Sequence, residues 1–119
     1  MVGIARKSDG TTYHAFRTLA FAPITDAADL TSLAGNYSSA YAINNAGEVV
    51  GTSKINSSVY HAFIVQSSLP VTMRDLNGLI ATGSGWELRN AEAINDKGQI
   101  AGWGYLNGLV RAFLLDPTK

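Results

Sequence analysis

Cysteine is absent from this chain, and histidine, proline and charged residues are scarce. Without cysteine there are no disulfide bridges, thiol nucleophiles or thiolate metal ligands. Only 15% of the side chains are charged, and nine basic residues balance nine acidic ones. Such a surface has no field of one sign to attract nucleic acid or an anionic membrane, so we expect neither as a partner.

Long apolar runs are missing as well, since none approaches the roughly 18 residues that a membrane-spanning helix needs. The first residues show no basic segment followed by an apolar one. We therefore expect no signal peptide and, for the chain as written, a cytoplasmic location. The sequence does contain 46% apolar residues, which favours one folded domain over residues 1–119 rather than a disordered chain.

A repeat of about fifty residues organises the chain. Residues 40–51 read Ala-Tyr-Ala-Ile-Asn-Asn-Ala-Gly-Glu-Val-Val-Gly, and residues 91–102 read Ala-Glu-Ala-Ile-Asn-Asp-Lys-Gly-Gln-Ile-Ala-Gly. A second block ends in Ala-Phe at positions 16, 63 and 113, and Asp-Leu follows at 29–30 and 75–76. These blocks divide the chain into a partial copy (1–35), a complete copy (36–80) and a second partial copy (81–119).

Each copy reads as short strands separated by turn residues, and no long helix is expected. Residues 24–33 are the only ambiguous window. The chain is predicted to be all-β, with about ten strands in repeated four-stranded antiparallel units that look like β-propeller blades; an open β-meander or sandwich is the alternative. In the complete copy we expect strands over Tyr41–Asn44, Val49–Lys54, Tyr60–Gln66 and Val71–Leu76.

Turns and core positions recur with the repeat. Asn and Asp bond their own backbone and glycine accepts a positive φ, so two tight hairpin loops are predicted, from Asn44 to Gly47 and from Asn95 to Gly98. Glycines inside strands, at 51 and 102, indicate close backbone approach or a bulge. The phenylalanines of the Ala-Phe block are expected in the core: Phe16, Phe63 and Phe113.

The third strand of the complete copy is apolar on both faces. Tyr60, Ala62 and Ile64 point one way, while His61, Phe63 and Val65 point the other, because side chains alternate along a strand. We therefore expect this strand to lie between neighbouring sheets.

The order Ala-Ile-Asn-(two residues)-Gly, Val-Val-Gly, His-Ala-Phe and Asp-Leu resembles that of the bacterial HAF-repeat proteins, which are named for the tripeptide. The likeness covers residues 2–115 and implies an extracellular, propeller-like repeat array without implying an activity. The chain departs from the pattern in its missing leader, in having too few copies for a ring, and in Arg111, which replaces the histidine of the third His-Ala-Phe.

The histidines, His14 and His61, occupy equivalent positions in successive copies, and Arg111 holds the third such position. Arginine neither ligates a metal nor acts as a base at neutral pH, so the shared property is an N–H donor. We expect these residues to donate hydrogen bonds to a backbone carbonyl or an asparagine. The loops at 44–47 and 95–98 contain one acidic residue, Asp96, too few for calcium. No metal, cofactor or enzymatic activity is predicted, since no titratable residues converge.

Three aromatic residues lie outside the repeat pattern: Trp86, in a glycine-rich segment, and Trp103 and Tyr105, which alternate with glycines and so share one face. They either cap the last, incomplete copy or form a platform for a carbohydrate or another small ligand.

Two functions are therefore expected from the sequence. The first is a non-catalytic interaction module that self-assembles through its repeat ends. A dimer is preferred, because two chains would supply six blades, and it would bury Trp103 and Tyr105 against the partner edge formed by Val2–Ala5. The alternative is a propeller that binds a glycan or small ligand through its aromatic residues.

Overall fold

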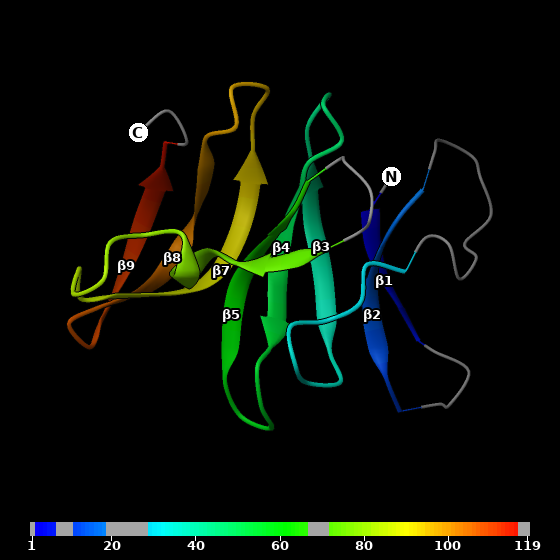
Figure 1. The fold of residues 1–119 in the computed structure, drawn as a ribbon, viewed down its shortest axis with the longest axis horizontal. Coiled ribbons are helices and arrows are strands. Elements are labelled where there is room, and N and C mark those ends of the chain that lie inside the picture. The colour runs from blue at the N-terminus through cyan, green and yellow to red at the C-terminus, as the bar shows by residue number, and fades with distance from the viewer. Residues whose placement is uncertain (1, 7–10, 19–28, 67–71, 117–119) are drawn as a thin grey trace.

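A computed structural model describes residues 2–6, 11–18, 29–66 and 72–116 of the chain (Figure 1). Within these residues the chain forms nine strands and one short 3-10 turn. The elements are β1 (Val2–Arg6), β2 (Tyr13–Arg17), β3 (Ser38–Ile43), β4 (Val49–Lys54), β5 (Tyr60–Val65), β6 (Met73–Asp75), η2 (Leu76–Gly78), β7 (Trp86–Ile94), β8 (Ile100–Leu106) and β9 (Leu109–Leu115). The predicted all-β class is confirmed. In this part of the chain no helix has the length and apolar character needed to cross a membrane.

The strands form three antiparallel meanders, ordered β1-β2, β3-β4-β5-β6 and β7-β8-β9. Figure 1 shows these sheets following one another along the long axis of the molecule, with the middle sheet between the other two. Each sheet corresponds to one copy of the repeat. The four strands of the complete copy are therefore one structural unit, as the sequence predicts.

The same register recurs in all three sheets. A glycine lies opposite the block phenylalanine each time, in the pairs Gly3–Phe16, Gly51–Phe63 and Gly102–Phe113. The bridge between Phe16 and Asp29 in the first copy also matches the pairing of Phe63 with Asp75 in the second. The first sheet thus corresponds to the second and third strand positions, with Asp29 bridged at the fourth, and the last sheet corresponds to the first, second and third.

The strand limits in the complete copy lie close to those predicted. β4 agrees at both ends, β5 ends one residue early, and β3 begins three residues early. β6 stops at Asp75 because the Asp75 side chain accepts a hydrogen bond from the Asn77 backbone N–H and caps η2. Val71, the predicted start of that strand, and residues 24–28 of the ambiguous window lie outside the described residues.

Each of the two strand glycines faces a bulge in the neighbouring strand. β3 is bulged between Ala40 and Ala42, and β7 carries an equivalent bulge between Ala91 and Ala93. A Cβ atom on Gly51 would lie 2.0 Å from the Ser39 carbonyl oxygen. Both readings of these glycines, the bulge and the close approach, are confirmed.

Apolar side chains form two clusters on opposite faces of the middle sheet. One cluster packs the middle sheet against the last sheet: Val50, Ala62, Ile64, Leu76, Leu88, Ala91, Ile100 and Phe113. The other packs it against the first copy: Ala15, Leu30, Ala40, Val49, Phe63 and Val65. β5 contributes alternate residues to each cluster, which confirms that this strand lies between sheets. Phe16, Phe63 and Phe113 are 8%, 0% and 9% exposed, so all three belong to the core as predicted.

The two predicted hairpin loops have the expected geometry and also join the sheets. Gly47 and Gly98 have φ values of 87° and 81°. Asn44 Nδ2 donates to the carbonyl of Asn95, its equivalent 51 residues later, at 3.0 Å. Asn45 donates from its backbone N–H and its Nδ2 to the Asp96 carboxylate at 2.8 and 2.7 Å. The turns of successive copies therefore stack on each other through equivalent residues.

Candidate functional site

The histidines pair with the aspartates of the Asp-Leu block. His14 Nδ1 lies 2.8 Å from Asp29 Oδ1, and His61 Nδ1 lies 2.7 Å from Asp75 Oδ2. For the two histidines, the acceptors predicted from the sequence, a backbone carbonyl or an asparagine, are therefore wrong. The carboxylate replaces them because the fourth strand position lies beside the third, which brings the aspartate of each copy next to its own histidine.

His61 also connects two sheets. Its Nε2 lies 3.2 Å from Glu87 Oε2 on β7, so one ring contacts carboxylates of the middle and the last sheet. Arg111, at the equivalent position of β9, is exposed and donates from Nη1 to the carbonyl of Val110. Over the described ranges no group of three or more acidic or histidine side chains is arranged to hold a metal ion.

The structure separates Trp86 from the other two candidate aromatics. Trp86 is the first residue of β7 rather than part of a loop, and its ring packs edge-on against Phe113 with the centroids 6.1 Å apart. Trp103 and Tyr105 lie together, with ring centroids 6.3 Å apart, and share a face as predicted. The Arg89 guanidinium stacks over the Tyr105 ring at 4.9 Å. Trp86 is thus a packing residue, and only Trp103 reaches the pocket described next.

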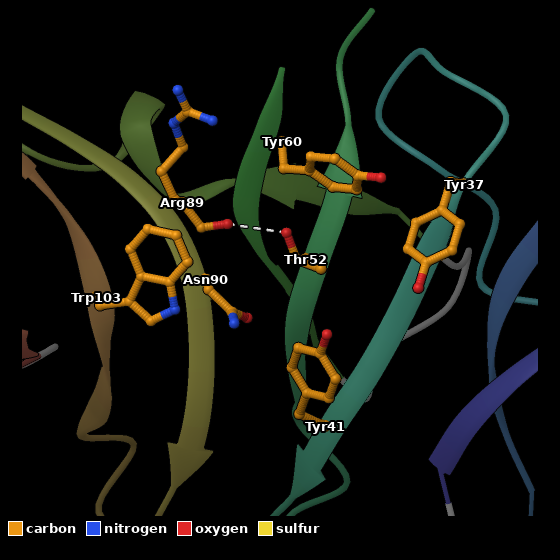
Figure 2. Close-up of a pocket in the computed structure, with 7 residues that line it drawn as sticks. All are labelled: Tyr37, Tyr41, Thr52, Tyr60, Arg89, Asn90 and Trp103. Carbon is orange, nitrogen blue, oxygen red and sulfur yellow. Dashed lines mark hydrogen bonds between the residues drawn. The ribbon is translucent and has the colours of Figure 1, made fainter. Parts of the chain in front are cut away.

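A pocket of about 280 Å³ lies where the edge strands β3 and β7 approach each other. Its lining residues are Tyr37, Tyr41, Thr52, Tyr60, Arg89, Asn90 and Trp103. Figure 2 shows the aromatic rings around the Thr52 and Asn90 side chains, with Asn90 between Trp103 and Tyr41. The Thr52 hydroxyl donates to the Arg89 carbonyl at 2.8 Å, which ties the two walls of the pocket together.

Tyrosine rings line one side of the pocket, and two of them contact each other. Burial raises the pKa of Tyr37 above its usual value, and the neighbouring Tyr41 and Tyr60 raise it further. The Tyr37 and Tyr60 rings meet edge-on with centroids 5.7 Å apart. The Lys54 ammonium lies 5.5 Å from the Tyr60 centroid. These contacts hold the rings in place at the pocket wall.

Two polar atoms in the pocket residues have no hydrogen-bond partner within the described structure. They are Asn90 Oδ1 and Arg89 Nε, and both are buried. A buried polar atom left without a partner costs about 1–3 kcal/mol. Arg89 Nε still has the Glu87 carboxylate 3.3 Å away, so the acceptor of the pocket whose hydrogen-bonding capacity is unused is Asn90 Oδ1.

Sequence reasoning missed most of this pocket. Tyr41 corresponds to Glu92 in the next copy, Tyr60 to Val110, and Thr52 to Trp103. At these positions the two copies have equivalent strands but different types of side chain. A search for departures from the repeat, rather than for matches to it, would have indicated them.

A second surface feature is the outer face of the last sheet. Leu114 and Val110 are 68% and 59% exposed there. Alanines on the same face are exposed too: Ala93, Ala101 and Ala112. We call these five residues the open face. In the middle sheet the equivalents of Leu114 and of the three alanines pack against the last sheet.

Comparison of the chain with protein-family models, with curated protein sequences and with solved structures gives no match.

Proposed function

We propose that this chain is a non-catalytic interaction module that assembles with a second copy of itself through the ends of its repeat array. One observation carries the proposal. Leu114, Ala112 and Ala101 of the open face are exposed, whereas their equivalents in the middle sheet, Ile64, Ala62 and Val50, are 7%, 0% and 0% exposed. The last sheet keeps an apolar surface of the kind that the repeat uses to join one sheet to the next.

Unpaired strand edges point to the same ends of the array. Among the described residues β9 pairs with β8 alone, although the equivalent strand β5 pairs on both sides. β1 likewise pairs only with β2, although the equivalent strand β4 has two neighbours. Open edges of this kind template association with another chain, and native proteins cover them.

A second copy of this chain has the apolar surface that would fit the open face. Inside the chain the equivalent face is covered by another sheet of the same repeat, so a further sheet from a second chain would repeat an existing interface. Each chain has three sheets, so two chains supply six. That number lies within the four to eight blades typical of closed propellers. The resemblance to HAF-repeat proteins supports such a propeller-like arrangement, and a dimer is the assembly we favour.

The non-catalytic part of the proposal is supported by the placement of the titratable groups. His14 and His61 each pair with the aspartate of their own copy. They stand at equivalent positions in successive sheets instead of converging on one point. Contacts that recur in this way, one in each of two successive copies, support a structural role for the two histidines.

Sedimentation velocity on a matched pair of variants tests the assembly. Leu114→Asp places a charge on the open face. Leu109→Asp makes the same change at a residue 57% exposed, on the opposite side of β9. We expect the wild type and Leu109→Asp to sediment as dimers, and Leu114→Asp to sediment as a 12.6 kDa monomer with an unchanged circular dichroism spectrum. A monomeric wild type, or a Leu114→Asp variant that dimerises as well as the wild type, would refute the proposal.

A further inference from the structure

We infer that the pocket between β3 and β7 is a carbohydrate-binding groove that takes a neutral oligosaccharide. This inference goes beyond self-assembly and rests on different residues, chiefly Tyr41 and Asn90. Figure 2 shows both on the edge strands of two adjacent sheets.

The shape of the site fits an extended ligand. Tyr41 and Asn90 line the pocket of about 280 Å³ and also an adjoining hollow of about 430 Å³, which Glu92 completes. The two hollows meet at these shared residues and run along the edges of β3 and β7. A chain of sugar units can occupy such a groove, with one unit in each hollow.

The walls combine exposed aromatic rings with polar groups. Tyr41 is 47% exposed and Trp103 is 36% exposed, so both rings present large apolar surfaces to solvent. Aromatic rings with a polar tip suit ligands that are apolar on one side and wet on the other. A pyranose ring has this character, because its C–H bonds form an apolar face and its hydroxyl groups surround it.

An unpartnered atom selects the class of ligand. Asn90 Oδ1 is an acceptor without a donor in the described structure. A sugar hydroxyl can donate to this oxygen. A proline-rich peptide also uses aromatic-lined grooves, but proline has no backbone N–H to offer Asn90 Oδ1.

The charges of the site favour a neutral sugar over an acidic one. Arg89 is the positive group of the pocket, and its Nε lies 3.3 Å from Glu87 Oε1. Glu92 adds a further carboxylate at the adjoining hollow. An anionic ligand would therefore meet a cation that is already balanced and a second negative charge.

Tryptophan fluorescence provides a local readout, because the chain has two tryptophans and only Trp103 lines the pocket. The Trp86→Phe variant leaves Trp103 as the sole reporter. An array of neutral oligosaccharides identifies the probe, and that oligosaccharide is then titrated into the variant. We expect a saturable change in Trp103 emission, at least tenfold weaker binding when Tyr41→Ala is added, and the same loss with Asn90→Ala.

Leu79→Ala is the control, since Leu79 is 48% exposed and lines neither hollow; it should change the affinity by less than twofold. The Leu114→Asp variant is titrated as well, because Leu114 does not line the groove and the sugar should bind it as tightly as the wild type. The inference is overturned if no oligosaccharide on the array binds, if a proline-rich peptide binds in its place, if Tyr41→Ala binds as the wild type does, or if Leu114→Asp does not bind.

Discussion

At the residue scale, the fold depends on a phenylalanine that covers a glycine in the neighbouring strand. A Cβ atom on Gly51 would approach the Phe63 ring to 3.0 Å, and the Gly3–Phe16 and Gly102–Phe113 pairs would show approaches of 2.9 and 2.8 Å. The ring occupies the space that the missing side chain leaves. This explains why glycine and phenylalanine recur together in all three copies.

Phe63→Ala should lower the free energy of unfolding by about 3–5 kcal/mol, because it empties the most buried of these three positions. Urea denaturation followed by circular dichroism measures the change. Leu109→Ala, at a site 57% exposed and outside the open face, is the control and should cost less than about 0.5 kcal/mol. A loss below about 1 kcal/mol for Phe63→Ala would mean that the ring is not in the core.

The histidine–aspartate pairs give a second prediction at this scale. His61→Ala removes the ring nitrogens that face Asp75 and Glu87 and should cost about 1–2 kcal/mol. His61→Arg, the residue found at the third equivalent position, retains N–H donors and should cost less than half as much. Thermal denaturation checks both, and zinc should leave the melting temperature of the wild type unchanged. A metal-dependent rise of several degrees that His61→Ala abolishes would show a ligand role instead.

At the element scale, the bulges of β3 and β7 depend on the glycines that face them in the neighbouring strands. The bulge carries a carbonyl oxygen to 2.0 Å from where a Cβ on Gly51 or Gly102 would lie, so any side chain there displaces the first strand of the sheet. This close contact therefore sets the path of β3 and β7, the edge strands that line the groove.

Gly51→Ala should therefore destabilise the protein by about 1–3 kcal/mol or more, because the clash is with backbone. Gly78→Ala is the control, since a Cβ at that position would meet nothing within 4 Å, and it should change stability by less than about 0.5 kcal/mol. Chemical denaturation of the two variants compares them. Equal stabilities would contradict the close approach.

The stacked turns predict unequal costs for the same substitution in two copies. Asn44 is buried and bonds both its own turn and the Asn95 carbonyl, whereas Asn95 is exposed. We expect Asn44→Ala to cost about 1–2 kcal/mol more than Asn95→Ala in a monomeric Leu114→Asp background, by urea denaturation. Equal losses would mean that the bond between turns contributes nothing.

Strands, turns and core positions could be predicted because each depends on a local pattern that the chain repeats. Val49–Lys54 and the Gly47 turn need only neighbouring residues to define them. Departures from the repeat mark single residues of the groove, such as Tyr41, but the groove itself could not be predicted, because Tyr41 and Asn90 come together only once two sheets stack. The histidine acceptor was missed for the same reason, although His61 and Asp75 both stand in recurring blocks.

At the scale of the whole molecule, two successive interfaces between sheets are occupied and a third, the open face, is not. The middle sheet is covered on both sides, by the first copy and by the last sheet. Figure 1 places the open end of the last sheet away from the first, so one chain does not close on itself. In the assembly that we propose, a second chain covers the open face.

Light scattering of the wild-type protein across a wide concentration range tests this most directly. We expect a mass near twice 12.6 kDa that persists as the protein is diluted into the low micromolar range. A mass that stays at 12.6 kDa even at submillimolar concentration would contradict self-assembly through the open face.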